Sequence, residues 1–422
     1  MVPPPRPSGF LPLAASGHTT RSPFGAAAPS ILLAVVAAAA MFVWIFFGDV
    51  LPGGRWFAVH LFTLGVVTNL VLTFSEHFSR TVTRTPGERA PWWPAVTNAG
   101  IIAVLVGLPT GQRVVLVTGA VVLTGVVFAA YRRLRRMRRQ AIGARFGWIV
   151  RVYERAHGAF IHGAVLGAVL GAAVATGPWY AAVRLAHLHA NILGWGGLTL
   201  LATLVFFGPS MARTRIESGA DARAARALRH GATGLTIAVA ALIVTALPAA
   251  AGVAARLVAA GGLGIYAVAV WIVCVPVIRA ASRARHSAQR PLIVFAAGWF
   301  LAVAVADVAI VATGAWRWLD ALGVVAVAGV LAQAILATLI YLAPMLRGRT
   351  AEGRDAIRTR LDRWTEVRAV VVNLGVVLAT LGALRLSTEL AFGAIGWLLL
   401  AAAAMSTAAA ALWPVSTGGA AA

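Results

Sequence analysis

The dominant feature of this chain is a succession of apolar stretches, each about as long as a membrane-spanning helix. A spanning helix needs roughly 20 apolar residues. Of the 422 residues, 60% are hydrophobic and 12% are charged, whereas soluble domains contain about 25% charged residues. We count twelve candidate spans, at 30–51, 56–76, 94–109, 113–131, 156–176, 179–208, 232–250, 254–278, 291–313, 318–344, 368–384 and 388–413. The sequence therefore predicts an all-α, polytopic transmembrane helical bundle and excludes a soluble enzyme, a disordered chain and a disulfide scaffold.

Two short tails flank the predicted helical domain, which covers 30–413. Residues 1–29 are rich in Pro, Gly and Ser, contain arginine, and predict a disordered cytoplasmic tail. Residues 414–422 form a short C-terminal tail. The first apolar run is too long for the apolar part of a signal peptide, so we expect it to be a retained anchor.

The arginines indicate the orientation of the spans. All 36 basic residues are arginine, and the net charge is +23. With twelve spans and a cytoplasmic N-terminus, 29 arginines fall on the inner side and five in the outer turns. This bias predicts that both termini lie in the cytoplasm, and we expect a bacterial plasma (inner) membrane protein. The run from Arg132 to Arg139 either sets the topology alone or also binds anionic lipids, and the distribution in short loops argues against nucleic-acid binding.

Two parts of the chain resemble each other. The segments 194–213 and 329–348 share an Ala-Thr-Leu core and a proline at a constant offset of 135 residues. A looser third copy aligns 60–65 with 187–194. These are either parallel internal repeats or convergent low-complexity sequence.

Histidines inside the predicted spans are the main candidate functional residues, because ionisable groups in a membrane are costly to bury. His60 lies near the outer end of the second span, and His187 and His189 lie in the outer half of the sixth. Two residues apart on a helix corresponds to a rotation of about 200°, so His187 and His189 face different neighbours. His157 and His162, on the fifth span, also cannot share one helix face. Any metal here is therefore expected between helices.

Heme b fits such an arrangement, because imidazoles from two facing helices can hold it. The close approach of the helices needs small residues, and Gly163, Gly167 and Gly171 follow His162 at a spacing of four. The same glycines are also typical of plain helix packing, and each histidine could instead have a hydrogen-bonded structural role. We expect His60, His187 and His189 as ligands of heme b and/or copper, with His162 as a further cofactor-binding candidate.

Other polar residues within the spans add to these candidates. Asn191 is one turn after His187 and could orient its imidazole, and Arg184, one turn before, could pair with a heme propionate or extend to the surface. Asp307 is a candidate for proton relay or for a partner of a histidine or arginine. Gln333 and Asn373 are expected to form hydrogen bonds between helices. Cys274, the one cysteine, excludes an internal disulfide and covalently attached c-type heme.

The stretch Ala186-His187-x-His189-x-Asn191-x-x-Gly194-Trp195 resembles a helix of heme–copper oxidase and nitric oxide reductase large subunits, and of NnrS-type multi-pass membrane proteins. The segment from His60 to Gly65 is similar to the start of the second helix in that superfamily. The resemblance implies that His60 and one of His187 and His189 are axial heme ligands, and that the other faces a second heme or copper. The chain lacks a His-Pro-Glu-Val-Tyr motif and an adjacent histidine pair, so the family's standard copper centre is not expected.

Three functions are compatible with these features. The first is a heme- and/or copper-binding membrane protein with an electron-transfer or oxidoreductase-like role linked to nitrogen-oxide or oxygen metabolism, working with a periplasmic copper or electron-transfer protein. The second is a proton-coupled or small-molecule transporter, which twelve spans and Asp307 would suit. The third is a non-catalytic membrane scaffold for a periplasmic copper enzyme.

Overall fold

The computed structural model describes residues 27–86, 90–141, 146–283, 289–348, 350–384 and 390–413. Most of the predicted N-terminal tail, 1–26, and the predicted C-terminal tail, 414–422, lie outside the described residues. The first helix begins at Ala28, within the tail that the sequence predicted to extend to residue 29.

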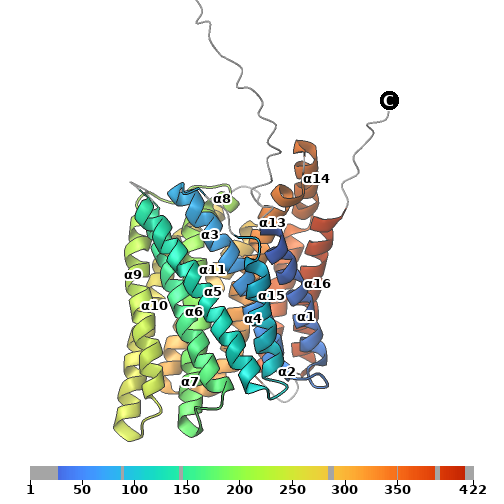
Figure 1. Cartoon of the computed structure of the whole chain (residues 1–422). Helices are drawn as coiled ribbons and strands as arrows, with labels where there is room; N and C mark the ends of the chain where they lie inside the picture. Colours follow the sequence, from blue (N-terminus) through green and yellow to red (C-terminus); the bar gives the residue numbers. More distant parts are fainter. Residues whose placement is uncertain are drawn as a thin grey trace, which may run out of the picture.

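The described residues form helices and no strand, and the helices run roughly parallel to one another in a bundle (Figure 1). In chain order they are α1 (Ala28–Phe47), α2 (Gly54–His60), η2 (Leu61–Thr68), α3 (Asn69–Thr83), α4 (Trp93–Gly107), α5 (Arg113–Gln140), α6 (Gly147–Gly171), α7 (Gly177–His189), η3 (Ala190–Gly197), α8 (Leu198–Met211), α9 (Ala220–Val244), α10 (Ala249–Arg283), α11 (Arg290–Thr313), η4 (Trp316–Trp318), α12 (Leu319–Val324), η5 (Val325–Ala332), α13 (Gln333–Arg347), α14 (Ala351–Asp362), α15 (Thr365–Ala383) and α16 (Leu390–Leu412). The predicted all-α membrane fold is confirmed.

Ten of the helical segments in the described part of the chain are long and apolar enough to cross a membrane. The predicted span at 94–109 corresponds to α4, which is apolar but has 15 residues. The predicted span at 156–176 corresponds to α6, which has 25 residues and carries the charged Arg151, Glu154 and Arg155 near its start. The count of twelve spans and the cytoplasmic location of both termini stay predictions.

The predicted loop between the tenth and eleventh spans contains a polar helix, α14. Its N-terminus is capped by Thr350, whose hydroxyl oxygen accepts a hydrogen bond from the Gly353 N–H at 3.1 Å. A threonine at this position satisfies an N–H group that the first turn of a helix leaves open. Hydropathy alone did not reveal this helix, because it only detects apolar segments.

Three long helical segments each contain an eight-residue π-helical turn. These turns are η2, η3 and η5, and each is continuous with the α-helices on both sides. The turns η3 and η5 begin at 190 and 325, 135 residues apart, which is the offset of the sequence similarity. The turns η2 and η3 begin at 61 and 190. When these two turns are aligned, His60 is equivalent in position to His189 and not to His187.

Each π-helical turn packs against the helix that precedes its long segment. Thus α1 packs on η2, α6 on η3 and α11 on η5, and a pair of packed helices follows each long segment, α4 with α5, α9 with α10 and α15 with α16. The same order of contacts therefore occurs three times along the chain. Local π-helical turns are frequent at functional sites because they redirect side chains.

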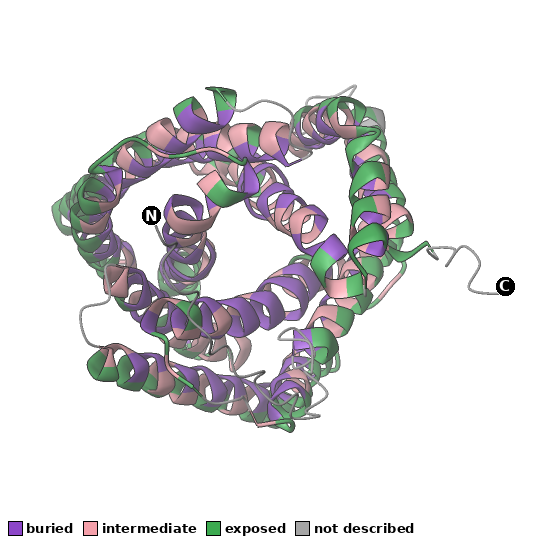
Figure 2. Cartoon of the chain, turned by 90° about the horizontal axis from the view of Figure 1, so that it is seen from above, coloured by how far each residue is buried: buried purple, intermediate pink, exposed green. Residues whose placement is uncertain are grey.

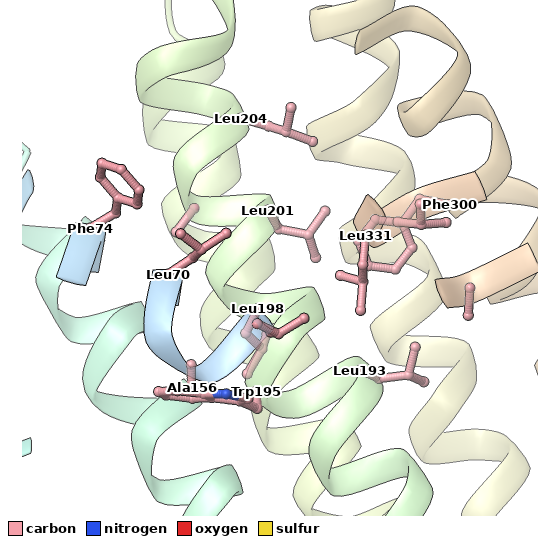
Figure 3. Packing of buried hydrophobic residues seen from close by; sticks show 14 of the residues in the cluster. Leu70, Phe74, Ala156, Leu193, Trp195, Leu198, Leu201, Leu204, Phe300 and Leu331 are labelled. Atoms are coloured by element: carbon pink, nitrogen blue, oxygen red, sulfur yellow. The ribbon is translucent and has the colours of Figure 1, made fainter. Parts of the chain in front are cut away.

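The interior of the bundle is filled by aliphatic and aromatic side chains. Figure 2 shows exposed residues around the outer perimeter and buried residues turned inward. In Figure 3, Leu198, Leu201 and Leu204 of α8 point toward Phe300 and Leu331 from other helices. In a membrane protein, such close packing, rather than water exclusion, holds the helices together.

Acidic side chains neutralise some of the arginines near one end of the bundle. Glu76, on α3, accepts from Arg80 at 2.6 Å and from Arg133 at 2.5 Å. Glu154 accepts from Arg138 Nε at 2.6 Å. The Glu76 carboxylate therefore joins α3 to α5.

The packing of α4 against α5 depends on Gly119 and can be tested at that position. A Cβ on Gly119 would lie 2.8 Å from the Gly100 carbonyl oxygen and from the Val104 backbone nitrogen, whereas a Cβ on Gly125, also on α5, meets nothing within 4 Å. We expect Gly119→Val to destabilise the protein by about 1–3 kcal/mol, because backbone cannot move aside easily. Thermal unfolding in detergent measures this, and Gly125→Val is the control. Equal effects of the two variants would contradict the packing.

Candidate functional site

His60 and His187 meet across two helices, as the sequence predicted for a site held between spans. His60 ends α2 and His187 lies in the last turn of α7. Their ring centroids are 6.3 Å apart and the ring planes differ by 19°. Both side chains are partly buried. The pair is therefore formed by residues that are 127 positions apart in the chain.

The same backbone interaction fixes both imidazoles. His60 Nδ1 lies 2.8 Å from the Trp56 carbonyl oxygen, and His187 Nδ1 lies 2.8 Å from the Gly163 carbonyl oxygen. Because a carbonyl oxygen only accepts, each Nδ1 carries the proton and donates it. In the neutral rings each Nε2 then keeps its lone pair. This tautomer is the one in which Nε2 can bind a metal.

Two of the predicted glycines make room for His187 and Asn191. A Cβ on Gly167 would lie 2.8 Å from His187 Cε1, and a Cβ on Gly163 would lie 2.4 Å or more from the Asn191 amide, too close to fit. A Cβ on Gly171 would instead meet Leu116 at 2.6 Å. Gly163 and Gly167 thus serve the histidine, whereas Gly171 serves helix packing.

Asn191 supports the same region of the helix. Its Nδ2 donates to the His187 carbonyl oxygen at 2.8 Å and lies 3.3 Å from His187 Nδ1. Because Nδ1 already donates to Gly163, the 3.3 Å approach is a proximity between two donors rather than a second hydrogen bond. Asn191 therefore lies beside the imidazole, where the sequence predicted it, and its one good hydrogen bond is to the backbone.

Sequence reasoning missed one member of this site, Trp56. Its ring stacks on the His60 imidazole, with centroids 4.1 Å apart and planes 24° apart. Its carbonyl also holds His60 Nδ1. The signal in the sequence is the spacing of four residues, which puts a tryptophan on the same helix face as the histidine one turn later.

His189 faces a different neighbour, as helical rotation requires. Its Nδ1 donates to the Leu185 carbonyl oxygen at 2.8 Å, and its Nε2 lies 3.1 Å from Asp307 Oδ1 on α11. Both side chains are buried, with 5% and 4% exposed. Of the partners considered for Asp307, the structure shows the histidine.

One extra proton belongs to the His189–Asp307 pair. Since His189 Nδ1 already donates its proton, the contact between Nε2 and the carboxyl group needs a second proton, on the ring or on Asp307. Without that proton no donor would face the carboxylate. The carboxylate would then be an unpaired buried charge, which is costly in an apolar region. Asp307 Oδ2 has no hydrogen-bond partner among the described residues. The pair therefore has the chemistry of a proton-carrying group.

The remaining candidates lie apart from these two pairs. His162 and Arg184 are exposed. His157 is buried and meets the Trp195 ring edge-on, with centroids 4.8 Å apart. In the described part of the chain, no group of three or more His, Cys, Asp or Glu side chains is placed to hold a metal ion. The structure thus brings together His60 and His187 but does not add His189 or His162 to them.

Two further polar residues differ in their outcome. Asn373 Oδ1 accepts from Trp299 Nε1 at 2.7 Å, which confirms the expected hydrogen bond between helices. Gln333 is buried, and neither of its amide atoms has a partner among the described residues, so the expected bond is not formed there. Cys274 is fully buried, as expected for a packing residue.

Comparison of the chain with models of known protein families gives no match, and comparison with curated proteins gives none either. The functional argument therefore rests on the residues and their geometry.

The His189–Asp307 contact can be tested by a double-mutant cycle. We expect Asp307→Leu and His189→Phe each to destabilise the protein by about 1–3 kcal/mol, because each leaves the other group buried without a partner. The double variant should lose less than the sum, by about 0.5–3 kcal/mol. Unfolding in detergent measures the four proteins. The control is a second cycle that combines Asp307→Leu with His162→Phe. Additive destabilisation by Asp307→Leu and His189→Phe in the first cycle would contradict the contact.

Proposed function

We propose that the chain binds heme b and/or copper between His60 and His187 and has a redox role linked to nitrogen-oxide or oxygen metabolism. The observation that carries the proposal is the pair of near-parallel imidazoles, 6.3 Å apart, on two different helices. The backbone hydrogen bonds at both Nδ1 atoms support it, because they leave both Nε2 atoms as acceptors.

The spacing of the rings suits one shared ion. Metal–imidazole nitrogen bonds are about 2 Å long, so two imidazoles on opposite sides of one ion have centroids roughly 6 Å apart. The observed distance of 6.3 Å agrees with this value. Two nitrogen ligands suit the axial positions of a heme iron and also a two-coordinate copper ion.

Each residue of the pair has a separate role in this proposal. His60 and His187 would hold the metal, and the carbonyls of Trp56 and Gly163 fix the orientation of the rings and raise their basicity as ligands. The ring of Trp56 covers one face of His60 and reduces access to water. A bound heme would supply one-electron transfer, at a potential set by its axial ligands and surroundings.

The link to nitrogen oxides or oxygen rests on the resemblance of the His187–Trp195 segment to heme–copper oxidase, nitric oxide reductase and NnrS-type proteins. The two pairs of residues would have different roles. Electrons would enter at the His60–His187 pair, from a periplasmic copper or electron-transfer protein, while His189 and Asp307 handle a proton. The partner and the bacterial plasma membrane location belong to this proposal.

Optical spectroscopy of the purified full-length protein tests the cofactor. We expect a Soret band that shifts on reduction with dithionite, or, for copper alone, about one copper ion per chain by metal analysis. His60→Ala and His187→Ala should each remove most of the cofactor, because one imidazole alone binds a shared ion far more weakly.

The matched control is His162→Ala, which removes an exposed histidine from α6, the helix that holds His187 through Gly163. This variant should keep the full cofactor content. A wild-type protein without heme or copper would reject the proposal, and so would cofactor content that is unchanged in both His60→Ala and His187→Ala.

A proton-coupled transporter is the second candidate, and the buried His189–Asp307 pair is the observation that favours it. That function calls for a polar path that leads to the pair. Gln333, another buried polar residue within the spans, lines an otherwise apolar hollow with residues of α1, α15 and α16. The cofactor proposal therefore has the stronger support.

A further inference from the structure

The helices α9 and α10 form a packed hairpin at one edge of the bundle (Figure 1). A hollow of about 460 Å³ lies on this hairpin. Its lining residues are Arg223, Arg226, Ala227 and His230 of α9 and Ile265, Val268, Ala269 and Ile272 of α10. One wall is therefore basic and the other is apolar, and the two walls come from different helices.

The basic wall is one face of α9. Arg223, Arg226 and His230 are separated by three and four residues, which places them along the same side of a helix, and all three are exposed. Arg223 forms an ion pair with Glu217. Arg226 has no ion pair or hydrogen bond with another residue that the structure describes. Its guanidinium group is thus available for an anion.

The apolar wall belongs to the membrane-crossing part of α10. Ile265 is 47% exposed and Val268 is 59% exposed. Behind them the two helices are in close contact, since a Cβ on Gly234 would lie 2.6 Å from the Gly262 carbonyl oxygen. The hollow is therefore an outward-facing groove toward the lipid and does not lead into the bundle.

We propose that this hollow binds an anionic phospholipid, with its phosphate between Arg223 and Arg226 and an acyl chain along Ile265 and Val268. The planar fork of an arginine side chain matches the oxygens of a phosphate group. Basic side chains next to an apolar helix surface match a charged headgroup joined to a chain. The site lies on α9 and α10 and is independent of the His60–His187 proposal.

Arginines elsewhere on the same side of the bundle provide a comparison. Arg133 and Arg138 on α5 already bind Glu76 and Glu154. Arg213 and Arg215, in the turn between α8 and α9, are exposed but do not line the hollow. They carry the same charge as Arg223 and Arg226 but have no apolar wall. Variants at these arginines therefore distinguish a lipid site formed by both walls from general attraction between charges.

Native mass spectrometry of the full-length protein in detergent tests the lipid site. Dioleoyl phosphatidylglycerol is titrated against the wild type and the variant R223Q/R226Q, and phosphatidylcholine with the same chains is titrated in parallel. We expect the wild type to bind phosphatidylglycerol more tightly than phosphatidylcholine. The variant should lose roughly tenfold or more in affinity for phosphatidylglycerol, because two basic side chains near the headgroup are removed.

The matched control is R213Q/R215Q, which should keep the wild-type affinity, and glycerol phosphate without acyl chains should not displace the lipid. Equal weakening in the control would overturn the proposal in favour of diffuse charge attraction. Equal affinity for the two lipids would overturn it as well, and displacement by glycerol phosphate would show a phosphate site rather than a lipid site.

Discussion

The close approach of α6 and α7 at two glycines is the constraint on which the candidate site depends. Gly163 offers its carbonyl oxygen to His187 Nδ1, and Gly167 leaves the space that the imidazole ring fills. A side chain at either position would separate the helices or displace the ring. Because the bilayer offers no water to satisfy polar groups, a histidine at this depth needs a protein partner for each nitrogen or a bound ion. The Gly163 carbonyl oxygen accepts a hydrogen bond from His187 Nδ1, and His187 Nε2 keeps its lone pair for a ligand.

The separation of His187 from His189 follows from the same helix geometry. The two side chains are two residues apart, so one reaches α2 and the other reaches α11. The π-helical turn η3 begins directly after His189, and η2 begins directly after His60. Two chemically different pairs therefore lie on either side of one helix, two imidazoles in one case and an imidazole with a carboxyl group in the other. Under the proposed function, such an arrangement would place an electron carrier and a proton carrier within one helical segment.

The sequence predicted the parts of this structure that depend on local composition and on helix rotation. The apolar runs located the long helices, although α5 ends nine residues after its predicted span and α6 and α9 begin nine and twelve residues before theirs. The rotation argument placed His187 and His189 on different faces. The sequence also predicted that His60 would lie close to His187 and His189, but not which of the two it would contact. Internal similarity aligned 60–65 loosely with 187–194, and the register of η2 and η3 matches His60 to His189, yet His187 is the one that faces it. Helix pairing is set by packing between distant segments, for which a single sequence carries little signal. The partner of Asp307 became visible only in three dimensions for the same reason. The stacking of Trp56 on His60 and the polar helix α14 are local features, which a search for apolar runs does not detect.

The proposed site requires one ion between His60 Nε2 and His187 Nε2. A cryo-EM map of the full-length purified protein, at a resolution that separates side chains, tests it most directly. If an ion is shared, continuous density should extend from both rings to a metal or to a flat macrocycle between α2 and α7, and this expectation is specific. It is contradicted by a map in which both imidazoles are well ordered and are bonded only to protein or water.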